Sequence, residues 1–327
     1  MTKIKPEYFY PDMLPCDRYL TDDKGIFINS YKDISIKRND KYVDKNYEQK
    51  IFIYFYLKFR LQQRKTIIIS LSEIMRDCFC NRNKYRNDLI KKVIVELLNE
   101  QKINDHNLII EYSCDVPVED IKLNTKIQIH KICEPTDKKN SVKRVPIEHS
   151  EFLTVINILK IDNHREEGVL YTRYERSFVI YSIVKYWFYQ ANNLDDNFYL
   201  DGNSYSLDYC TGITYSLGDI EIDTCFRKEA LIKYILPLEN QKMITKFYPG
   251  KYSPTGERVD LFVPDDYKNI IFLSAPTMFC LGHSLESFKS IRKRITRLKR
   301  DRDINYLTNE HRIYEKIEML ERSNTPN

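Results

Sequence analysis

Arginine, lysine and asparagine side chains gather between positions 82 and 87, and their chemistry is that of hydrogen bonding to nucleic-acid bases. The residues of this cluster are Arg82, Asn83, Lys84, Arg86 and Asn87. In a major groove, arginine pairs through two hydrogen bonds with guanine, and asparagine does so with adenine. The cluster therefore predicts a base-reading surface if a helix presents these side chains together. The alternative is a polar turn at the surface of a small helical domain.

Residue patterns that carry out bond chemistry are missing from the sequence. There is no Gly-x-x-x-x-Gly-Lys-Ser/Thr stretch, and only 8 glycines occur, which argues against a P-loop ATPase. No His-x-His pair accompanies a tyrosine nucleophile, as a rolling-circle nicking enzyme requires. The pairs Asp195-Asp196 and Asp265-Asp266 lie in predicted loops and look like solvated turns. We therefore expect no enzyme activity and no cofactor.

Cysteine and histidine spacing gives a weak indication of zinc. Cys78-x-Cys80 and His130-x-x-Cys133 could supply ligands, with Cys114 on a neighbouring predicted strand. Structural zinc sites use cysteines with two to four residues between them, so a one-residue gap is poor geometry. Because buried cysteine is common as a small hydrophobic residue, we predict no metal site.

The base-reading cluster needs a helix-turn-helix to position it. The sequence predicts a buried helix at 47–62, a strand at 66–69, and a short helix through Ile74 and Met75 with Ser70 or Ser72 as its cap. Cys80 to Lys84 forms the turn. A longer helix to about Asn99 follows, with its apolar stripe at Leu89, Ile90, Val93, Ile94, Leu97 and Leu98.

Two strands at 108–113 and 125–132 follow, with Ile127, Ile129 and Ile132 facing inward. Helix, strand, helix, helix and hairpin is the order of a winged helix. In a helix-turn-helix the start of the second helix enters the major groove. Lys122 and Lys126, near the hairpin connection, are predicted to contact phosphate.

The same order recurs with little sequence identity in the second half. A long helix is predicted at 172–192, with Phe178, Tyr181, Ile183, Val184, Trp187 and Phe188 in the core. A strand and a short helix follow within 205–218. Asp223 or Thr224 then caps a helix that Pro237 should end or kink one turn early. A hairpin of 243–247 with 258–263 carries Lys251 in its connection, where it is expected to hold phosphate.

Basic residues of this second half complete the predicted DNA surface. Arg227 and Lys228 lie off the apolar stripe of their helix and are expected to read bases. A helical tail at 284–321 carries a dense basic cluster that is expected to hold phosphates. Its predicted phosphate-binding residues are Arg292, Lys293, Arg294, Arg297 and Arg300. The alternative for the tail is a solvated helix docked on the body.

Composition permits this interpretation without requiring it. The 327 residues carry a net charge of +5, and 42% of them are hydrophobic, enough for two domains that each bury a core. The N-terminus shows no secretory signal and no apolar run approaches ~18 residues, so we expect a cytoplasmic protein that does not enter a membrane. Its eight cysteines are expected to be free thiols.

The predicted fold is α+β and helix-dominated, with two winged-helix domains in tandem and a basic helical tail. An N-terminal arm occupies 1–45, the first domain 46–133, a linker 134–149, the second domain 150–268 and the tail 269–327. Pro, Ser and mixed charges mark the linker.

Several stretches of the chain resemble the initiator proteins of theta-replicating plasmids and the related replication proteins of phages of low-GC bacteria. In the first domain these stretches are KIFIYFYLKF, ISLSEIMRD and NRNKYRNDLIKKVIVELLNEQKI. In the second they are SFVIYSIVKYWFYQ and DTCFRKEALIKYILPLENQKMITKF. The resemblance covers residues 47 to 263. It implies that one domain pairs protomers and that both read repeated origin DNA. Pro237 and the Arg-rich tail depart from the family's pattern.

From these observations we expect a sequence-specific double-stranded DNA-binding protein that initiates plasmid or phage replication without bond chemistry. Its expected partners are double-stranded DNA, a second copy of itself and replication-machinery proteins. Two alternatives stay open: a transcriptional regulator or partition adaptor that binds operator DNA, and a winged-helix module that binds other proteins. Direct repeats beside the gene would favour the initiator, and a palindrome would favour the regulator.

Overall fold

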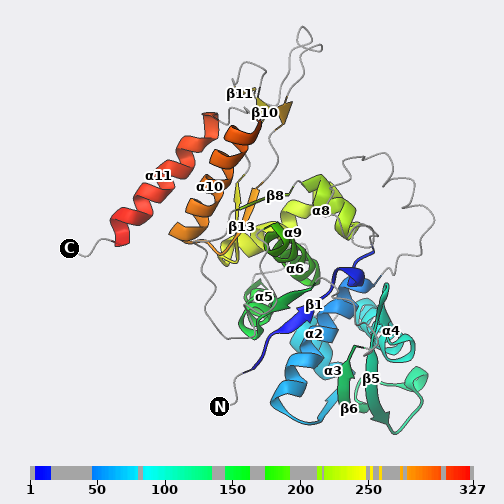
Figure 1. Cartoon of the computed structure of the whole chain (residues 1–327). Helices are drawn as coiled ribbons and strands as arrows, with labels where there is room; N and C mark the ends of the chain where they lie inside the picture. The colour runs from blue at the N-terminus through cyan, green and yellow to red at the C-terminus, as the bar shows by residue number, and fades with distance from the viewer. Residues whose placement is uncertain are drawn as a thin grey trace. The chain divides into compact units, whose positions relative to one another are not determined.

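The chain is α+β, with long helices and small antiparallel sheets, in the computed structural model shown in Figure 1. The structure describes residues 4–15, 46–79, 84–134, 144–162, 174–191, 212–215, 217–247, 251–252, 258–259, 273–274, 278–302 and 307–324. Over those residues, no helix combines the length and the apolar character needed to cross a lipid bilayer.

Contacts divide the chain into two units at positions that differ from the predicted domain boundaries. The first unit comprises Met1–Ser182 and Glu221–Tyr234, and the second comprises Ile183–Ile220 and Ile235–Asn327. The predicted boundary at 134–149 is not a point of division, because aromatic side chains on both sides of it share one core.

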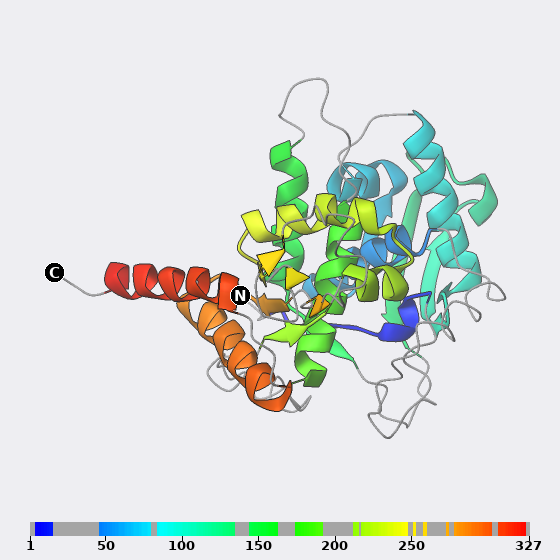
Figure 2. The same cartoon turned by 90° about the horizontal axis from the view of Figure 1, so that it is seen from above.

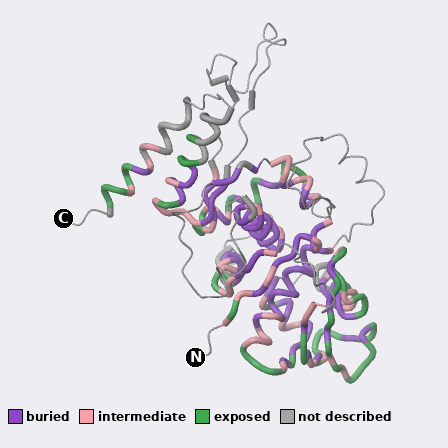
Figure 3. The backbone as a smooth tube through the Cα atoms, viewed as in Figure 1, coloured by how far each residue is buried: buried purple, intermediate pink, exposed green. Residues whose placement is uncertain are grey.

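That core is built around α2 (Tyr47–Gln63), which is apolar on nearly all sides and almost wholly buried in Figure 3. Its Phe52 ring lies 5.0 Å from Phe152 of α5 (His149–Asp162), measured between centroids. Its Phe55 ring lies 5.0 Å from Phe178 of α6 (Tyr174–Ala191). The predicted buried helix at 47–62 is confirmed.

The elements after α2 follow the predicted order. β2 (Ile67–Ser70) leads into α3 (Leu71–Ile74), which continues as a π-helical turn over Met75–Phe79. α4 (Lys84–Glu100) buries Ile90, Val93, Ile94, Leu97 and Leu98, as its apolar stripe predicted. β5 (Ile109–Cys114) and β6 (Lys126–Cys133) complete an antiparallel sheet of order β2-β6-β5. The inward positions Ile127, Ile129 and Ile132 are buried.

Part of the N-terminal arm is an integral part of the first unit. β1 (Glu7–Phe9) pairs antiparallel with β7 (Val145–Ile147), a strand inside the predicted linker. The linker prediction is therefore wrong for 145–147. Pro146 marked the segment as a break, yet a proline is tolerated in a strand that lies at the edge of its sheet. Residues 135–143 of the linker lie outside the described part of the chain.

A short hairpin holds the arm through polar contacts. β3 (Lys102–Ile103) and β4 (His106–Asn107) are joined by a tight turn. In this turn the Asn104 side-chain amide donates to the Met13 carbonyl at 2.7 Å. The buried His106 ring is 2.9 Å from Asp12, between Nδ1 and Oδ1. These contacts explain why residues 4–15 pack against the rest of the first unit.

The second half repeats the order of elements. α6 is followed by β8 (Ile213–Thr214), α8 (Leu217–Thr224), α9 (Lys228–Asn240), β9 (Ile244–Phe247) and β13 (Met278–Leu281). The sheet order is β8-β13-β9, so the last strand of the set is again the central one. The predicted α6 core is confirmed at Phe178, Tyr181, Ile183, Val184 and Phe188, whereas Trp187 is half-buried.

The predicted hairpin of this half is wrong. β9 pairs with β13, and the described part of its expected partner, Arg258–Val259, does not pair with β9. The segment Arg258–Val259 is β11, which pairs with β10 (Lys251–Tyr252), and β10 also pairs with β12 (Leu273–Ser274). β13, which lies beyond the predicted boundary at 268/269, pairs with β9 and β8 in one sheet. Residues 260–263 lie outside the described part of the chain.

Two predictions about α9 are also corrected. Asp223 and Thr224 do not cap this helix, because they are the buried last residues of α8. α9 begins at Lys228, whose backbone N–H donates to Glu221 Oε1 at 3.4 Å. Pro237 does not end the helix, which runs on to Asn240. Pro237 lacks the N–H of one helical hydrogen bond, and its own carbonyl accepts from Gln241 at 3.0 Å. The alternative, a kink at Pro237, stays a prediction.

Two helices follow the second sheet, as predicted for the tail. α10 (Leu285–Arg302) and α11 (Leu307–Asn324) lie beside each other in Figures 1 and 2. Lys289 Nζ is 2.9 Å from Glu321 Oε1. The Arg292 guanidinium lies 4.4 Å from the centre of the Tyr314 ring. The tail is therefore a docked helix pair along this length.

Candidate nucleic-acid interface

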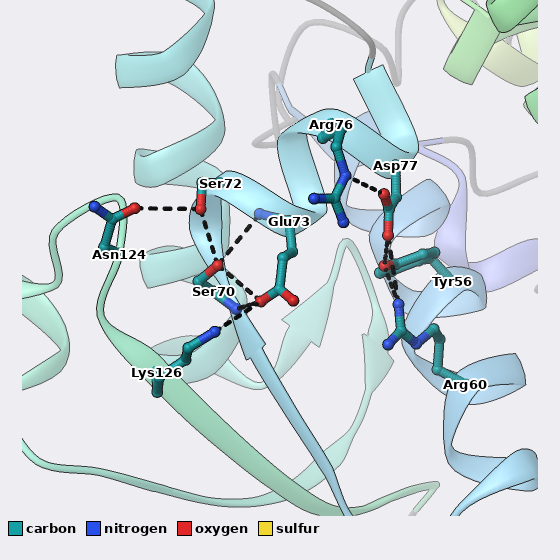
Figure 4. A network of polar contacts seen from close by, with 9 residues as sticks. All are labelled: Tyr56, Arg60, Ser70, Ser72, Glu73, Arg76, Asp77, Asn124 and Lys126. Atoms are coloured by element: carbon teal, nitrogen blue, oxygen red, sulfur yellow. Dashed lines mark hydrogen bonds and ion pairs between the residues drawn. The ribbon is translucent and has the colours of Figure 1, made fainter.

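The start of α3 is fixed by a reciprocal capping box, shown in Figure 4. The Glu73 backbone N–H donates to Ser70 Oγ at 3.3 Å, and the Ser70 backbone N–H donates to Glu73 Oε2 at 2.7 Å. Both otherwise unpaired donors at the helix start are thereby satisfied. The predicted cap at Ser70 is confirmed, and its partner Glu73 was missed although Ser-x-x-Glu stands in the sequence.

The capping box also holds Lys126, one of the predicted phosphate contacts. Its Nζ lies 3.3 Å from Glu73 Oε2 at the point where β6 pairs with β2. Hydrogen bonds from Ser70, with a smaller effect of Lys126, lower the pKa of the Glu73 carboxyl. Glu73 is therefore a charged carboxylate at neutral pH, and it pairs with Lys126, the side chain predicted to contact phosphate.

A second polar group in Figure 4 anchors the π-helical turn to α2. Tyr56 donates to Asp77 Oδ2 at 2.6 Å, and Arg60 lies 3.4 Å from the same oxygen. Arg76 Nε donates to Asp77 Oδ1 at 2.9 Å. Burial, followed by the bond to Asp77, raises the pKa of Tyr56, so its phenol stays protonated. These contacts hold the π-helical turn, which ends at Phe79, against α2.

The base-reading residues predicted for the first half surround the start of α4. Lys84, Arg86 and Asn87 lie in its first turn, although their side chains are outside what the structure describes. Arg82 and Asn83 fall in 80–83, which is not described. The structure therefore places the backbone of three of these five residues on one helix start.

The connection between β5 and β6 is acidic, which opposes its predicted role at phosphate. Asp115, Glu119 and Asp120 are exposed there, against Lys122. Glu119 accepts a hydrogen bond from the Asn99 amide at 3.0 Å, so this carboxylate lies at the end of α4. A shallow hollow beside it is lined by Asn99, Tyr112 and Val116. These carboxylates repel the negatively charged DNA backbone, so Lys122 is poorly placed to hold phosphate.

Arg227 and Lys228 are both exposed at the start of α9. A buried ion pair lies behind them. Arg176 of α6 lies 3.1 Å from Glu48 Oε1 of α2 and donates to the Tyr234 hydroxyl of α9 at 2.9 Å. The Arg176 guanidinium also lies 4.8 Å from the Phe226 ring centre. These contacts fix the rotation of α9 about its own axis, so Arg227 and Lys228 face outward.

The remaining predicted phosphate contacts lie on α10 and β10. Arg292 and Lys293 are exposed on α10. Arg294, Arg297 and Arg300 lie farther along the same helix, and Lys251 is the first residue of β10, with side chains that are not described. Arg292 stacks on Tyr314, which leaves the edge of its guanidinium available while fixing its position.

Cysteine and histidine do not assemble in the described residues. Cys78 is buried in the core, and His130 Nε2 lies 3.1 Å from the Ser113 hydroxyl. No group of three metal-ligating side chains occurs in the part of the chain that the structure describes. Cys80 lies outside that part, so the absence of zinc stays a prediction.

Two exposed apolar residues of α9, Ile232 and Leu236, were not predicted from the sequence. Their signal was available, since both stand off the stripe that Leu231, Ile235 and Leu238 form. Together with Lys228 and Lys233 they make up the outward face of the helix. Comparison of the chain with protein-family models, with curated proteins and with solved structures finds no match.

Proposed function

We propose that this chain is a tandem winged-helix protein that binds specific double-stranded DNA and starts replication of a plasmid or phage. The observation that carries the proposal is a repeat of architecture. Two sets of elements run helix, strand, helix, helix, strand, strand, and each forms a three-stranded sheet with its last strand in the centre. That order and pairing support the assignment of two winged helices.

The third helix of each set supports the assignment of DNA as the partner. In a helix-turn-helix this helix enters the major groove by its first turns. α4 begins at Lys84 within a basic stretch of the sequence, and α9 begins at Lys228 directly after Arg227. Arginine and asparagine at these starts suit guanine and adenine edges. The proposed action is binding in the cytoplasm, by a homodimer, without bond chemistry or cofactor.

One observation favours a second role for the first set. Its β5–β6 connection carries Asp115, Glu119 and Asp120 at the surface, and its Lys126 is paired with Glu73. A connection of this charge suits a protein surface better than a phosphate backbone. The second candidate is therefore a division of labour, in which the first set binds a protein, such as a second copy of the chain, and the second set reads DNA.

Footprinting of the DNA that flanks the protein's own gene tests the proposal. We expect protected direct repeats at about 50 mM salt and weaker protection at about 200 mM, because phosphate contacts release counterions. The Arg227→Ala/Lys228→Ala variant should lose the footprint. Arg322→Ala, an exposed residue of α11, should keep it.

Two results would contradict the proposal in different ways. A protected palindrome in place of repeats would indicate a dimeric regulator. An absence of protection at either salt concentration, with the protein folded, would refute DNA recognition as its function.

A further inference from the structure

The outward face of α9 carries two large apolar side chains. Ile232 is 54% exposed and Leu236 is 52% exposed. They stand four residues apart, so they lie one above the other on the same face of the helix. Most large apolar residues of the described chain are buried, which makes an exposed pair at helical spacing a feature to explain.

The helix cannot turn to bury this pair. Its opposite face holds Leu231, Ile235 and Leu238, each with no exposed surface. Tyr234 on that side accepts a hydrogen bond from Arg176. Rolling α9 would expose three core residues and break this bond in order to cover two. Ile232 and Leu236 therefore face outward in the folded chain.

Cationic side chains flank the apolar pair. Lys228 stands one turn before Ile232, and Lys233 follows it directly; both are exposed. Among the described residues, no ion pair engages the ammonium group of either lysine. Glu229 shares the face and Glu221 accepts from the Lys228 backbone N–H, so with Arg227 the charge of the face is mixed with a small basic excess. A partner that fits must present anionic groups around an apolar centre.

The major groove of a duplex meets this requirement. Phosphates line its two sides, and the C5 methyl group of thymine is the apolar group at its floor. Four residues of α-helix rise about 6 Å, close to two base-pair steps of about 3.4 Å each. Ile232 and Leu236 are therefore spaced to meet two thymines one or two steps apart while the lysines reach the phosphates.

We propose that Ile232 and Leu236 read thymine methyl groups, so that α9 selects thymine-containing steps by apolar contact. This inference rests on the proposed function, DNA recognition by the third helix. It adds the chemical feature that the helix recognises, which the basic residues alone do not define.

The test begins with the full-length chain and a pool of random duplexes of about 30 base pairs, from which the tightest binders are selected and sequenced. Each thymine of the best duplex is then replaced in turn by uracil, which removes one methyl group and keeps the base pair. We expect the wild-type chain to lose about three- to fivefold in affinity at one or two positions. Ile232→Ala and Leu236→Ala should each bind the thymine duplex more weakly and become insensitive to uracil at one of those positions.

Leu153→Ala provides the matched control, because Leu153 is an exposed leucine on α5, 40% accessible. It should discriminate thymine from uracil as the wild type does. Thermal melts should show that all three variants stay folded, since each removes an exposed side chain.

Different results overturn different claims. If no sequence is enriched from the pool, both the proposed function and this inference fail. If sequences are enriched but uracil binds like thymine, or both variants keep the wild-type discrimination, only the inference fails. A variant that changes the oligomeric mass in light scattering while keeping that discrimination would show that the pair contacts protein, which also overturns it.

Discussion

Arg176 is the counter-ion of a carboxylate that has almost no access to water. The side chain of Glu48 is 3% exposed, and Arg176 reaches its Oε1 at 3.1 Å. Removing one partner of such a pair leaves a buried charge uncompensated, at a cost of about 3–5 kcal/mol. We predict that Arg176→Met loses this amount in urea denaturation, whereas Arg322→Met, at an exposed pair on α11, loses less than about 1 kcal/mol. A loss below about 1 kcal/mol for Arg176→Met would show that Glu48 finds another partner.

The same pair gives stability a dependence on pH. Burial raises the pKa of the Glu48 carboxyl, and the charge of Arg176 opposes that rise. A raised folded-state pKa means that the folded chain holds the proton more tightly, so stability is lost as the pH rises through that pKa. Without Arg176 the pKa rises further and the loss grows. The difference in unfolding free energy between wild type and Arg176→Met should therefore be larger at about pH 7 than at about pH 4.5. Equal differences at both pH values would contradict the assignment.

The hydrogen bonds of Ser70 give stability the opposite dependence on pH. Its hydrogen bonds to Glu73 lower the pKa of that carboxyl, so their contribution is present above the ordinary glutamate pKa and is lost as the pH falls through the lowered value. Ser70→Ala removes the cap and should cost about 1 kcal/mol at neutral pH. In urea denaturation at acidic pH the cost should be smaller, because protonating Glu73 removes the charge that the Ser70 hydrogen bonds stabilise. A cost that is the same at acidic and neutral pH would show that the carboxylate takes no part in the cap.

At the scale of elements, α10 packs against the β8-β13-β9 sheet next to Gly212. Gly212 N–H donates to the Ser290 carbonyl at 3.1 Å, and a Cβ at this position would lie 3.2 Å from Ile291 Cγ1 and 3.3 Å from the Phe279 carbonyl oxygen. We predict that Gly212→Ala forces the helix away and costs about 1–3 kcal/mol. Hydrogen exchange of the α10 amides should accelerate with it.

Ile291→Ala supplies the control for this crowding. Alone it should destabilise by opening a cavity, since Ile291 is wholly buried. Combined with Gly212→Ala, it removes the nearest clashing atom, so the two costs should fall short of additivity. Strict additivity would show that the cost of the alanine does not arise from the side chain of Ile291 but from backbone atoms such as Ile291 Cα and the Phe279 carbonyl.

How far the sequence predicts these elements depends on their length and periodicity. α2, α4 and α6 each run for 17 or 18 residues without glycine or proline, and all three were predicted. β13 was not, because Met-Phe-Cys-Leu shows no alternation and its pairing with β9 spans about thirty residues of intervening chain. The turn chemistry of 248–257 favoured a nearer partner for β9. Local signals cannot reveal that the chain leaves a sheet and returns to its centre.

Among the side chains of the candidate interface, some could likewise be predicted from the sequence and others could not. That Lys84, Arg227 and Lys228 lie off the apolar stripes of their helices could be recognised from the sequence. That Glu73 pairs with Lys126 depends on the register of β2 with β6, which the sequence leaves open. That Ile232 stays exposed depends on Arg176, fifty-six positions earlier, holding Tyr234. Contacts between distant segments decide both.

At the scale of the whole molecule, positive charge is concentrated in one helix. α10 contains eight lysines and arginines against Glu286 and Asp301, which gives +6, whereas the whole chain carries +5. The rest of the chain is therefore nearly neutral, at −1. Attraction to DNA that does not depend on sequence should then come mainly from α10, while the starts of α4 and α9 decide which sequence is bound.

This separation predicts two independent responses to mutation. Replacing Arg294, Arg297 and Arg300 by glutamine should reduce the slope of log affinity against log salt by about 0.9 for each phosphate that the variant no longer neutralises, with the preferred sequence unchanged. The matched control replaces three exposed lysines of the first unit, Lys65, Lys92 and Lys102, by glutamine and should keep the slope. An unchanged slope in the α10 variant would mean that the helix only docks against α11, and that the chain binds DNA through α4 and α9 without an electrostatic clamp.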